Sequence, residues 1–150
     1  MIRQFTKEEV CIKCQGCCRF SDSQTPWSPR LLDTEIETLP KLTPVKLSGK
    51  EGFFCPLLDI AANKCKAYPN HPFDCQLYPF VLNRKYGKIY LAVDLNCHYA
   101  KDNFKTKEFK DYVSYLIKAL SEEKFRIVLA RNPQMIQVYA DVVDIEELNI

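Results

Sequence analysis

The sequence predicts a small α+β domain in which a cysteine-rich part with short β-hairpins precedes a helical part. Eight cysteines lie between residues 11 and 97, in a stretch that is rich in proline and turn residues. Residues 88–94 alternate as a half-buried strand does, and residues 104–130 carry apolar side chains at helical spacing. A chain of 150 residues is long enough to bury a core as one domain. We expect a cysteine-cluster region at about 11–98 and a helical region at about 102–150.

The composition is that of an ordinary globular protein. Hydrophobic residues make up 47% of the chain and charged residues 27%, which excludes a wholly disordered chain. The formal net charge is only +2, so we expect neither nucleic acid nor a membrane as a partner. No apolar stretch approaches the roughly 18 residues of a membrane span, and the first ten residues lack the apolar core of a secretory signal. We therefore expect a cytoplasmic protein with reduced cysteines.

The residues around the first cysteines predict a short helical turn followed by irregular structure. Thr6 and Glu9 have the spacing of a capping box, which favours a helical turn leading into the cysteines. Gly16 then favours tight, irregular turns over a regular helix.

A longer helix is expected at residues 29–39. Ser28 followed by Pro29 is typical of a helix start, because a serine hydroxyl can cap free N–H groups and proline fits the first turn. The buried side of this helix would carry Leu32, Ile36 and Leu39.

Two hairpins are expected in the turn-rich middle of the chain. Residues 53–58 and 64–68 can pair as a short hairpin. Residues 78–83 and 88–94 flank the turn sequence Arg-Lys-Tyr-Gly and predict a second, longer hairpin.

The last third of the chain is expected to be mainly helical. The helical spacing over 104–130 is interrupted at Ser121, where a second helix can start, and Asn132 followed by Pro133 ends it. Residues 135–143 fit a strand, with a helix as the alternative. The acidic tail after residue 143 is expected to fray.

The cysteines carry the chemistry of this sequence. Four of them form the motif C-x-x-C-x-x-C-C within eight residues, and four more follow at wider spacing. Clustered thiols in a chain without a secretory signal indicate metal binding rather than disulfides. Thiolates are soft ligands that suit Zn²⁺ or an iron–sulfur cluster, so we expect zinc or iron as the cofactor. The candidate metal ligands are Cys11, Cys14, Cys17, Cys18, Cys55, Cys65, Cys75 and Cys97.

The motif resembles a ferredoxin loop only in part. Its first three cysteines have the C-x₂-C-x₂-C opening of bacterial ferredoxins, but the next ferredoxin step is missing. The fourth ligand would come from afar, with Cys55 or Cys75 as candidates. Cys17 and Cys18 are adjacent and cannot easily face one metal, so one of them belongs to a second site or to the core. The count of eight allows two four-cysteine sites, one site with four spare thiols, or one site with mixed ligands.

Four other residues near the cysteines each have two interpretations. His71 and His98 are either additional metal ligands or ordinary loop histidines. Tyr68 and Tyr78 are either proton donors near a metal or wall residues with a satisfied hydroxyl.

The spacing of these residues resembles the CxxCxxCC cysteine-cluster family of YkgJ-like zinc- or iron-chelating proteins. The motifs that carry the resemblance are Cys11-x-x-Cys14-x-x-Cys17-Cys18, Cys55-Pro56-Leu57-Leu58 and Cys65-x-x-Tyr68-x-x-His71-Pro72-x-x-Cys75-x-x-Tyr78-Pro79. The resemblance covers about residues 11–98 and implies metal or iron–sulfur binding. Flagellin lysine N-methylases carry a similar cluster within much longer chains. Where the family usually has the pair Arg-Pro, this chain has His71-Pro72.

Three functions are compatible with these observations. The first is a metal-binding protein that chelates zinc, iron or an iron–sulfur cluster. The second is an enzyme that uses the centre for methyl transfer or redox modification; against it, the four glycines form no nucleotide-binding motif. The third is a closed structural metal site, with the helical region as an interaction surface. An open coordination position would favour catalysis and a closed four-thiolate site would favour structure.

Overall fold

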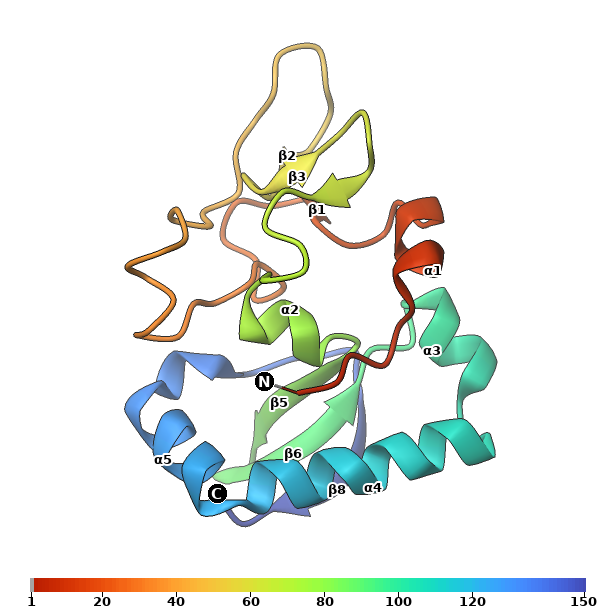
Figure 1. Ribbon diagram of the computed structural model, residues 1–150, viewed down its shortest axis with the longest axis vertical. Coiled ribbons are helices and arrows are strands. Elements are labelled where there is room, and N and C mark those ends of the chain that lie inside the picture. Colours follow the sequence, from red (N-terminus) through yellow and green to blue (C-terminus); the bar gives the residue numbers. More distant parts are fainter. Residues whose placement is uncertain (1) are drawn as a thin grey trace.

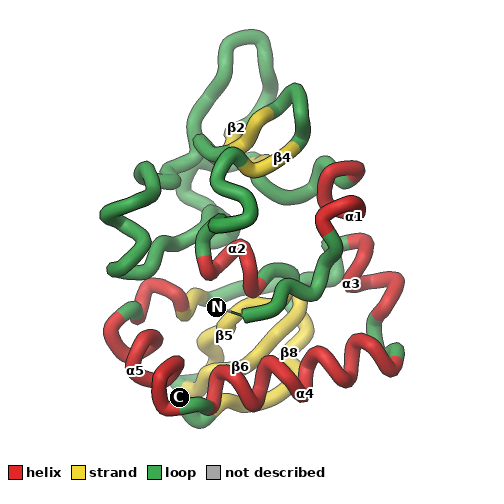
Figure 2. Tube along the Cα trace, viewed as in Figure 1, coloured by secondary structure: helices red, strands yellow, loops and turns green. Residues whose placement is uncertain are grey.

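A four-stranded sheet and the helices packed on it form one half of the molecule, and the cysteine-rich segments form the other (Figures 1 and 2). The computed structural model describes residues 2–150. The α+β fold class predicted from the sequence is confirmed. Among the described residues, no helix combines the length and the apolar character needed to cross a membrane.

The sheet is built on the predicted long hairpin. Strands β5 (Phe80–Lys85) and β6 (Lys88–Val93) pair antiparallel, with Leu82 opposite Leu91. Strand β7 (Ile136–Gln137) lies parallel to β5, and β8 (Val143–Leu148) lies antiparallel to β6. The strand order is therefore β7-β5-β6-β8.

The two faces of the sheet are covered differently. Successive side chains of a strand point to opposite faces, so Phe80, Leu82, Leu91 and Val93 all meet the helices in the main core. On the other face, Val81 and Ala92 pack with Trp27 and Tyr139, which come from loops. The rest of the main core is supplied chiefly by Phe109, Tyr112, Leu116, Leu120, Phe125 and Leu129.

The helices over residues 107–131 agree with the prediction from the sequence. Helix α4 (Lys107–Ser121) and helix α5 (Glu123–Arg131) are separated at Glu122, so the predicted restart is confirmed. Thr106 caps α4, because its hydroxyl oxygen accepts the Phe109 N–H at 3.3 Å. The sequence did not predict α3 (His98–Asn103) or the 3₁₀ turn η1 (Pro133–Met135).

The cysteine-rich half contains only short elements. The predicted hairpin around residues 59–63 is confirmed as β3 and β4, but Phe53 and Phe54 pair with Arg19 and Phe20 instead of extending it. The elements are α1 (Glu8–Lys13), β1 (Arg19–Phe20), β2 (Phe53–Phe54), β3 (Leu58–Asp59), β4 (Lys64–Cys65) and α2 (Phe73–Leu77).

The predicted helix over residues 29–39 is wrong. The segment forms consecutive turns, and Ile36, expected on the buried side, is 61% exposed. Distant side chains bind the backbone N–H groups here: Asp74 accepts the N–H of Arg30 at 2.8 Å, and Asn132 accepts the N–H of Asp33 at 2.7 Å. Ser28 does not cap a helix either, since its hydroxyl donates to the Leu42 carbonyl at 3.1 Å.

The predicted capping box is also wrong, although the short helix that it predicted is present. Lys7, not Thr6, is the residue that precedes α1, and no side chain caps the helix. The Thr6 hydroxyl is buried without a hydrogen-bond partner. The helix extends to Lys13 and so includes Cys11, and the irregular structure expected around Gly16 follows it.

The expected frayed tail is instead the edge strand β8, so the region from 102 to 150 is helical only in its first part. The acidic side chains of β8 have partners across the sheet: Asp144 lies 3.0 Å from Lys85 and Glu147 lies 2.7 Å from Lys88. The strand predicted at 135–143 is present only as β7.

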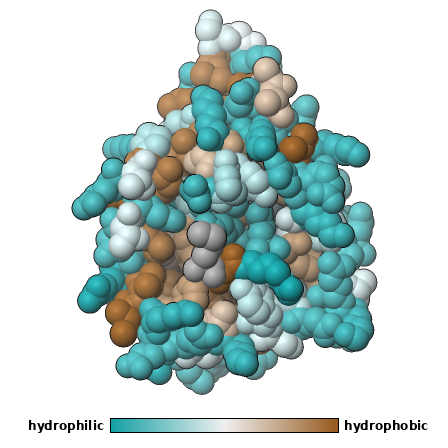
Figure 3. Space-filling model, viewed as in Figure 1, coloured by the Kyte–Doolittle hydropathy of each residue, from teal (hydrophilic) through white to brown (hydrophobic). Residues whose placement is uncertain are grey.

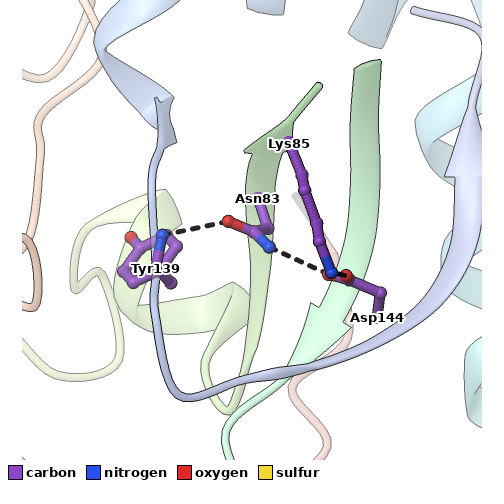
Figure 4. A network of polar contacts seen from close by, with 4 residues as sticks. All are labelled: Asn83, Lys85, Tyr139 and Asp144. Atoms are coloured by element: carbon purple, nitrogen blue, oxygen red, sulfur yellow. Dashed lines mark hydrogen bonds and ion pairs between the residues drawn. The ribbon is translucent and has the colours of Figure 1, made fainter. Parts of the chain in front are cut away.

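A buried amide holds this edge of the sheet together (Figure 4). Asn83 donates to Asp144 at 2.8 Å and accepts the Tyr139 N–H at 2.9 Å. A buried amide with both ends bonded fixes its neighbours, because leaving either partner unpaired is costly. Asn83 therefore joins β5, β8 and the loop that carries Tyr139.

One face of the molecule presents few apolar patches. The face seen in Figure 3 is mostly hydrophilic, with apolar residues in scattered positions. The most exposed aliphatic residues, Val138, Ile36 and Ile127, lie on separate segments of the chain.

The N-terminal segment passes into the main core before α1 begins. Ile2 and Phe5 are each 5% exposed, and the Phe5 ring packs against four aromatic rings. The backbone of Arg3 is also held by α4, since the Tyr112 hydroxyl donates to its carbonyl and its N–H donates to the Tyr115 hydroxyl at 2.8 Å. The cysteine-rich half is thus tied to the core from its first residues.

Replacing Phe5 with alanine is expected to lower the free energy of unfolding by about 3–5 kcal/mol, as for other buried phenylalanines. Urea denaturation followed by circular dichroism measures this change. Ile36→Ala is the matched control, because the exposed Ile36 side chain should contribute less than about 0.5 kcal/mol. Equal effects of the two substitutions would contradict the anchoring role of Phe5.

Candidate metal centre

The structure brings all eight cysteines to one cavity of about 420 Å³. All eight are free thiols, and their exposure ranges from the buried Cys55 to the exposed Cys17. The cavity lining comes from both halves of the molecule, with Leu42 and Leu57 on one side and Val81 and Asp94 on the other. The fold thus brings together cysteines that are widely spaced in the sequence.

Two helices position the cysteines nearest the helical half. Cys11 lies within α1, and Cys14 directly follows its last residue. The Asn63 amide from the β3–β4 turn holds this helix end, because it donates to the carbonyls of Ile12 at 2.5 Å and Cys14 at 2.9 Å. Cys97 directly precedes α3.

The backbone turns sharply between the two adjacent cysteines of the motif and the strand that follows. Cys18 has a φ of 64°, a left-handed conformation that is unusual for a residue other than glycine. Its carbonyl accepts the Cys55 N–H at 2.9 Å. This bond sets Cys18 beside Cys55, at the end of the β1–β2 pair.

The β3–β4 hairpin and α2 supply the other two thiols. Cys65 lies opposite Leu58 in the hairpin, and the Leu58 N–H donates to the Cys55 carbonyl at 3.0 Å. Cys75 is in the middle of α2, whose first N–H, that of Phe73, is bound by Glu35 at 2.7 Å.

Three of the thiols accept hydrogen bonds from the backbone at the same relative positions. Each of Cys55, Cys65 and Cys97 accepts from the N–H groups two and three residues further along the chain. An N–H donor stabilises a thiolate more than a thiol, as it does for metal-bound sulfur. At Cys65 and Cys97 these N–H groups only partly offset burial, which still raises the pKa of both thiols.

Most of the thiols are held against ionisation by their surroundings. Burial raises the pKa of Cys11 to about 11 and that of Cys17 to about 12, and the charges of neighbouring thiols add to both shifts. Burial and the neighbouring Asp74 raise the pKa of Cys75 well above its ordinary value. A cation among these sulfurs would remove the repulsion, so the donor set chemically fits a thiophilic metal.

Cys18 and Cys55 form a hydrogen-bonded pair that behaves differently. The Cys18 thiol donates to the Cys55 sulfur, which lowers the pKa of Cys55 and raises that of Cys18. The backbone N–H groups of Leu57 and Leu58 add to the stabilisation of the Cys55 thiolate.

The thiols surround the cavity rather than converging on one point. Among residues 2–150, no three His, Cys, Asp or Glu side chains lie together in a metal-binding arrangement. The chemistry of the donors fits zinc or iron, whereas their placement is not that of a formed metal site.

The two histidines occupy unlike environments. His71 is 8% exposed, with Nδ1 at 3.1 Å from the Pro69 carbonyl and Nε2 at 3.2 Å from the Gln4 amide oxygen. Burial lowers the pKa of His71, and the neutral ring has one N–H, so it donates to only one of these two oxygens. His98 is exposed at the start of α3 and lines the cavity.

The tyrosines also differ. Tyr68 stacks on His71 with ring centroids 5.0 Å apart, as a wall residue does. The Tyr78 hydroxyl donates to Asp94 at 2.9 Å and lies beside the Cys17 thiol. Sequence reasoning missed Asp94, although its position at the end of the predicted strand 88–94 was a usable signal.

Comparison with known families gives one match. The family model CxxCxxCC, described as a "putative zinc- or iron-chelating domain", matches residues 10–113. No curated protein and no solved structure matches the chain.

In the metal-free, reduced protein, one thiol is expected to ionise at lower pH than the rest, because Cys18 and two N–H groups stabilise the Cys55 thiolate. Titration of the ultraviolet thiolate absorbance measures this early step. Cys18→Ala should move it to higher pH, whereas Ser21→Ala, a cavity-lining change without a thiol, should not. An early step that persists unchanged in Cys18→Ala would contradict the pairing.

Proposed function

The chain belongs to the CxxCxxCC family of zinc- or iron-chelating domains, and on this basis we propose that it binds zinc or iron through its eight cysteine thiolates. The observation that carries the proposal is that all eight free thiols line one cavity although they are spread from residue 11 to residue 97. Cys11, Cys17 and Cys75 stay protonated in the protein alone, and a bound cation would stabilise their thiolate forms.

The donor set favours an all-sulfur centre. The single N–H of the neutral His71 ring donates to the Pro69 carbonyl or to the Gln4 amide oxygen, and the buried Asp94 is engaged by Tyr78 and by the Asn96 N–H at 2.9 Å. Thiolates alone suit tetrahedral Zn²⁺ or an iron–sulfur cluster. The C-x₂-C-x₂-C spacing of Cys11, Cys14 and Cys17 supports the cluster, because ferredoxin loops use the same spacing.

The protein's own groups prepare the site in two ways. The N–H donors after Cys55, Cys65 and Cys97 stabilise sulfur in its ionised form. The left-handed turn at Cys18 and the Asn63 clamp on the end of α1 fix where the motif enters the cavity. A bound metal would supply the positive charge that balances the thiolates stabilised by these N–H donors.

A second candidate function, a metal-dependent enzyme, is favoured by the cavity itself. A volume of about 420 Å³ is in the range that binds small molecules. One wall is aromatic, with the rings of Trp27 and Tyr139 4.7 Å apart, and the Tyr78–Asp94 pair lies beside Cys17. A small molecule that binds only to the metal-loaded protein would support this candidate.

Cys14→Ser and Cys75→Ser are each expected to lower the bound metal and the thermal stability, because metal-binding energy here is partly folding energy. Elemental analysis after anaerobic purification measures the metal, and an absorption spectrum distinguishes a coloured iron–sulfur cluster from colourless zinc. Ser21→Ala is the control and should keep the full metal content. Full metal retention in both cysteine variants would overturn the proposal.

A further inference from the structure

Three residues of the cavity wall, Trp27, Asp74 and Tyr139, have a chemistry different from that of the thiols. Trp27 lies in the loop after β1, Asp74 lies in α2, and Tyr139 lies in the segment between β7 and β8. Two of them supply aromatic rings and the third supplies a carboxylate. We call these three residues the aromatic corner.

The two rings of the aromatic corner form a fixed pair. Their centroids are 4.7 Å apart and their planes are inclined at 49°. Trp27 and Tyr139 pack with Val81 and Ala92, on the face of the sheet opposite the main core. The Asn83 amide oxygen accepts the Tyr139 N–H at 2.9 Å (Figure 4). A preformed pair of this kind reduces the ordering that a ligand must impose when it binds.

A hydrogen bond brings Asp74 to the same part of the wall. Its Oδ2 accepts the N–H of Arg30, which follows Trp27 closely in the chain, at 2.8 Å. Burial and then the charge of Asp74 raise the pKa of Tyr139, so the carboxylate also lies within electrostatic range of that ring. The carboxylate and the two rings therefore line one region of the cavity.

No side-chain cation forms an ion pair with Asp74 among residues 2–150. The Arg30 guanidinium donates instead to the Ser28 carbonyl, with Nη1 at 3.0 Å, and Arg30 does not line the cavity. Lys64, a cation of the cavity wall, is paired with Glu8 at 2.6 Å. The Asp74 carboxylate is therefore available to a positively charged ligand.

We infer that the aromatic corner binds the protonated amino group of a small organic amine. A carboxylate accepts N–H bonds from an ammonium group, and such charge-assisted bonds are the strong ones. The faces of the Trp27 and Tyr139 rings attract the same cation electrostatically. A bare metal ion suits this corner less well, because the rings offer it no ligand. The cavity of about 420 Å³ has room for a small amine. The inference goes beyond the proposed function, since none of the three residues is a thiol.

Trp27 is the only tryptophan of the chain, so the protein's tryptophan fluorescence reports on this corner alone. Benzylammonium chloride, added to anaerobically purified protein at about pH 8, where the amine is protonated, should change the emission until it saturates. Benzyl alcohol, a neutral molecule of similar shape, should bind about tenfold or more weakly, because it cannot form a charge-assisted bond to Asp74. Equal binding of the two molecules, or no saturable change with benzylammonium, would overturn the inference.

Asp74→Asn tests the carboxylate, because asparagine keeps an oxygen that can accept the Arg30 N–H. This variant should bind benzylammonium about tenfold or more weakly than the wild type. Asp141→Asn is the matched control and should bind as the wild type does, since Asp141 is exposed and does not line the cavity. Unchanged affinity in folded Asp74→Asn would contradict the assignment. Should this variant fail to fold, the comparison of benzylammonium with benzyl alcohol on the wild type decides.

A second pair of variants tests the aromatic ring. Tyr139→Leu should weaken the binding of benzylammonium several-fold, whereas Tyr139→Phe, which keeps the ring, should not. Equal affinities of these two variants would count against the aromatic part of the site. Elemental analysis of the same samples separates this inference from the proposed function: absence of zinc and iron from the wild type would count against the proposed function alone. Where Asp74→Asn changes the metal content, the Tyr139 pair decides.

Discussion

The insertion of Phe5 into the aromatic core is the interaction on which the arrangement of the thiols depends. The ring lies 5.6 Å from Phe80, 5.9 Å from Phe109 and 4.9 Å from Tyr112, centroid to centroid. It also lies 5.2 Å from Tyr99, in α3 just after Cys97. One side chain therefore fixes the approach of α1, which carries Cys11, and contacts the helix that begins after Cys97. An aromatic pair of this kind contributes about 0.5–1.5 kcal/mol beyond the apolar area it buries.

The cysteine-rich half depends on bonds from distant side chains because its own strands and helices are so short. Glu35 holds the first N–H of α2, Asp74 holds the Arg30 N–H, and Asn63 holds the end of α1. Each bond joins segments far apart in the sequence and satisfies backbone groups that regular structure leaves free. A half built in this way has little local stability, so a cation shared by its thiols would have a large effect on it.

The sequence contains enough information for the elements whose pattern is local. The β5–β6 hairpin and the α4–α5 break follow from apolar periodicity and turn residues, and the gathering of all eight cysteines agrees with the metal-binding prediction. The helix expected at 29–39 failed because Asp74 and Asn132, remote in sequence, bind its N–H groups. The tail was expected to fray because the pairing of Asp144 with Lys85 could not be seen before the sheet order was known.

The same reasoning explains what the sequence left open at the thiols. Spacing identified all eight cysteines as candidate ligands and indicated that Cys17 and Cys18 face different ways, but it could not reveal the left-handed φ at Cys18. The sequence also could not distinguish the environment of His71 from that of His98. His71 is occupied by the Gln4 amide, a partner 67 residues away.

The path of the chain through the core has a consequence for biosynthesis. Phe5 leaves the ribosome first, but Phe109 and Tyr112, which hold it, are made only after all the cysteines. The motif at residues 11–18 therefore emerges with its thiols exposed and waits until nearly two-thirds of the chain has been translated before Cys97 exists. Because folding of such a long-range arrangement cannot be completed during early synthesis, the eight thiols are gathered late, and the nascent chain is most open to oxidation or to the wrong metal before that point.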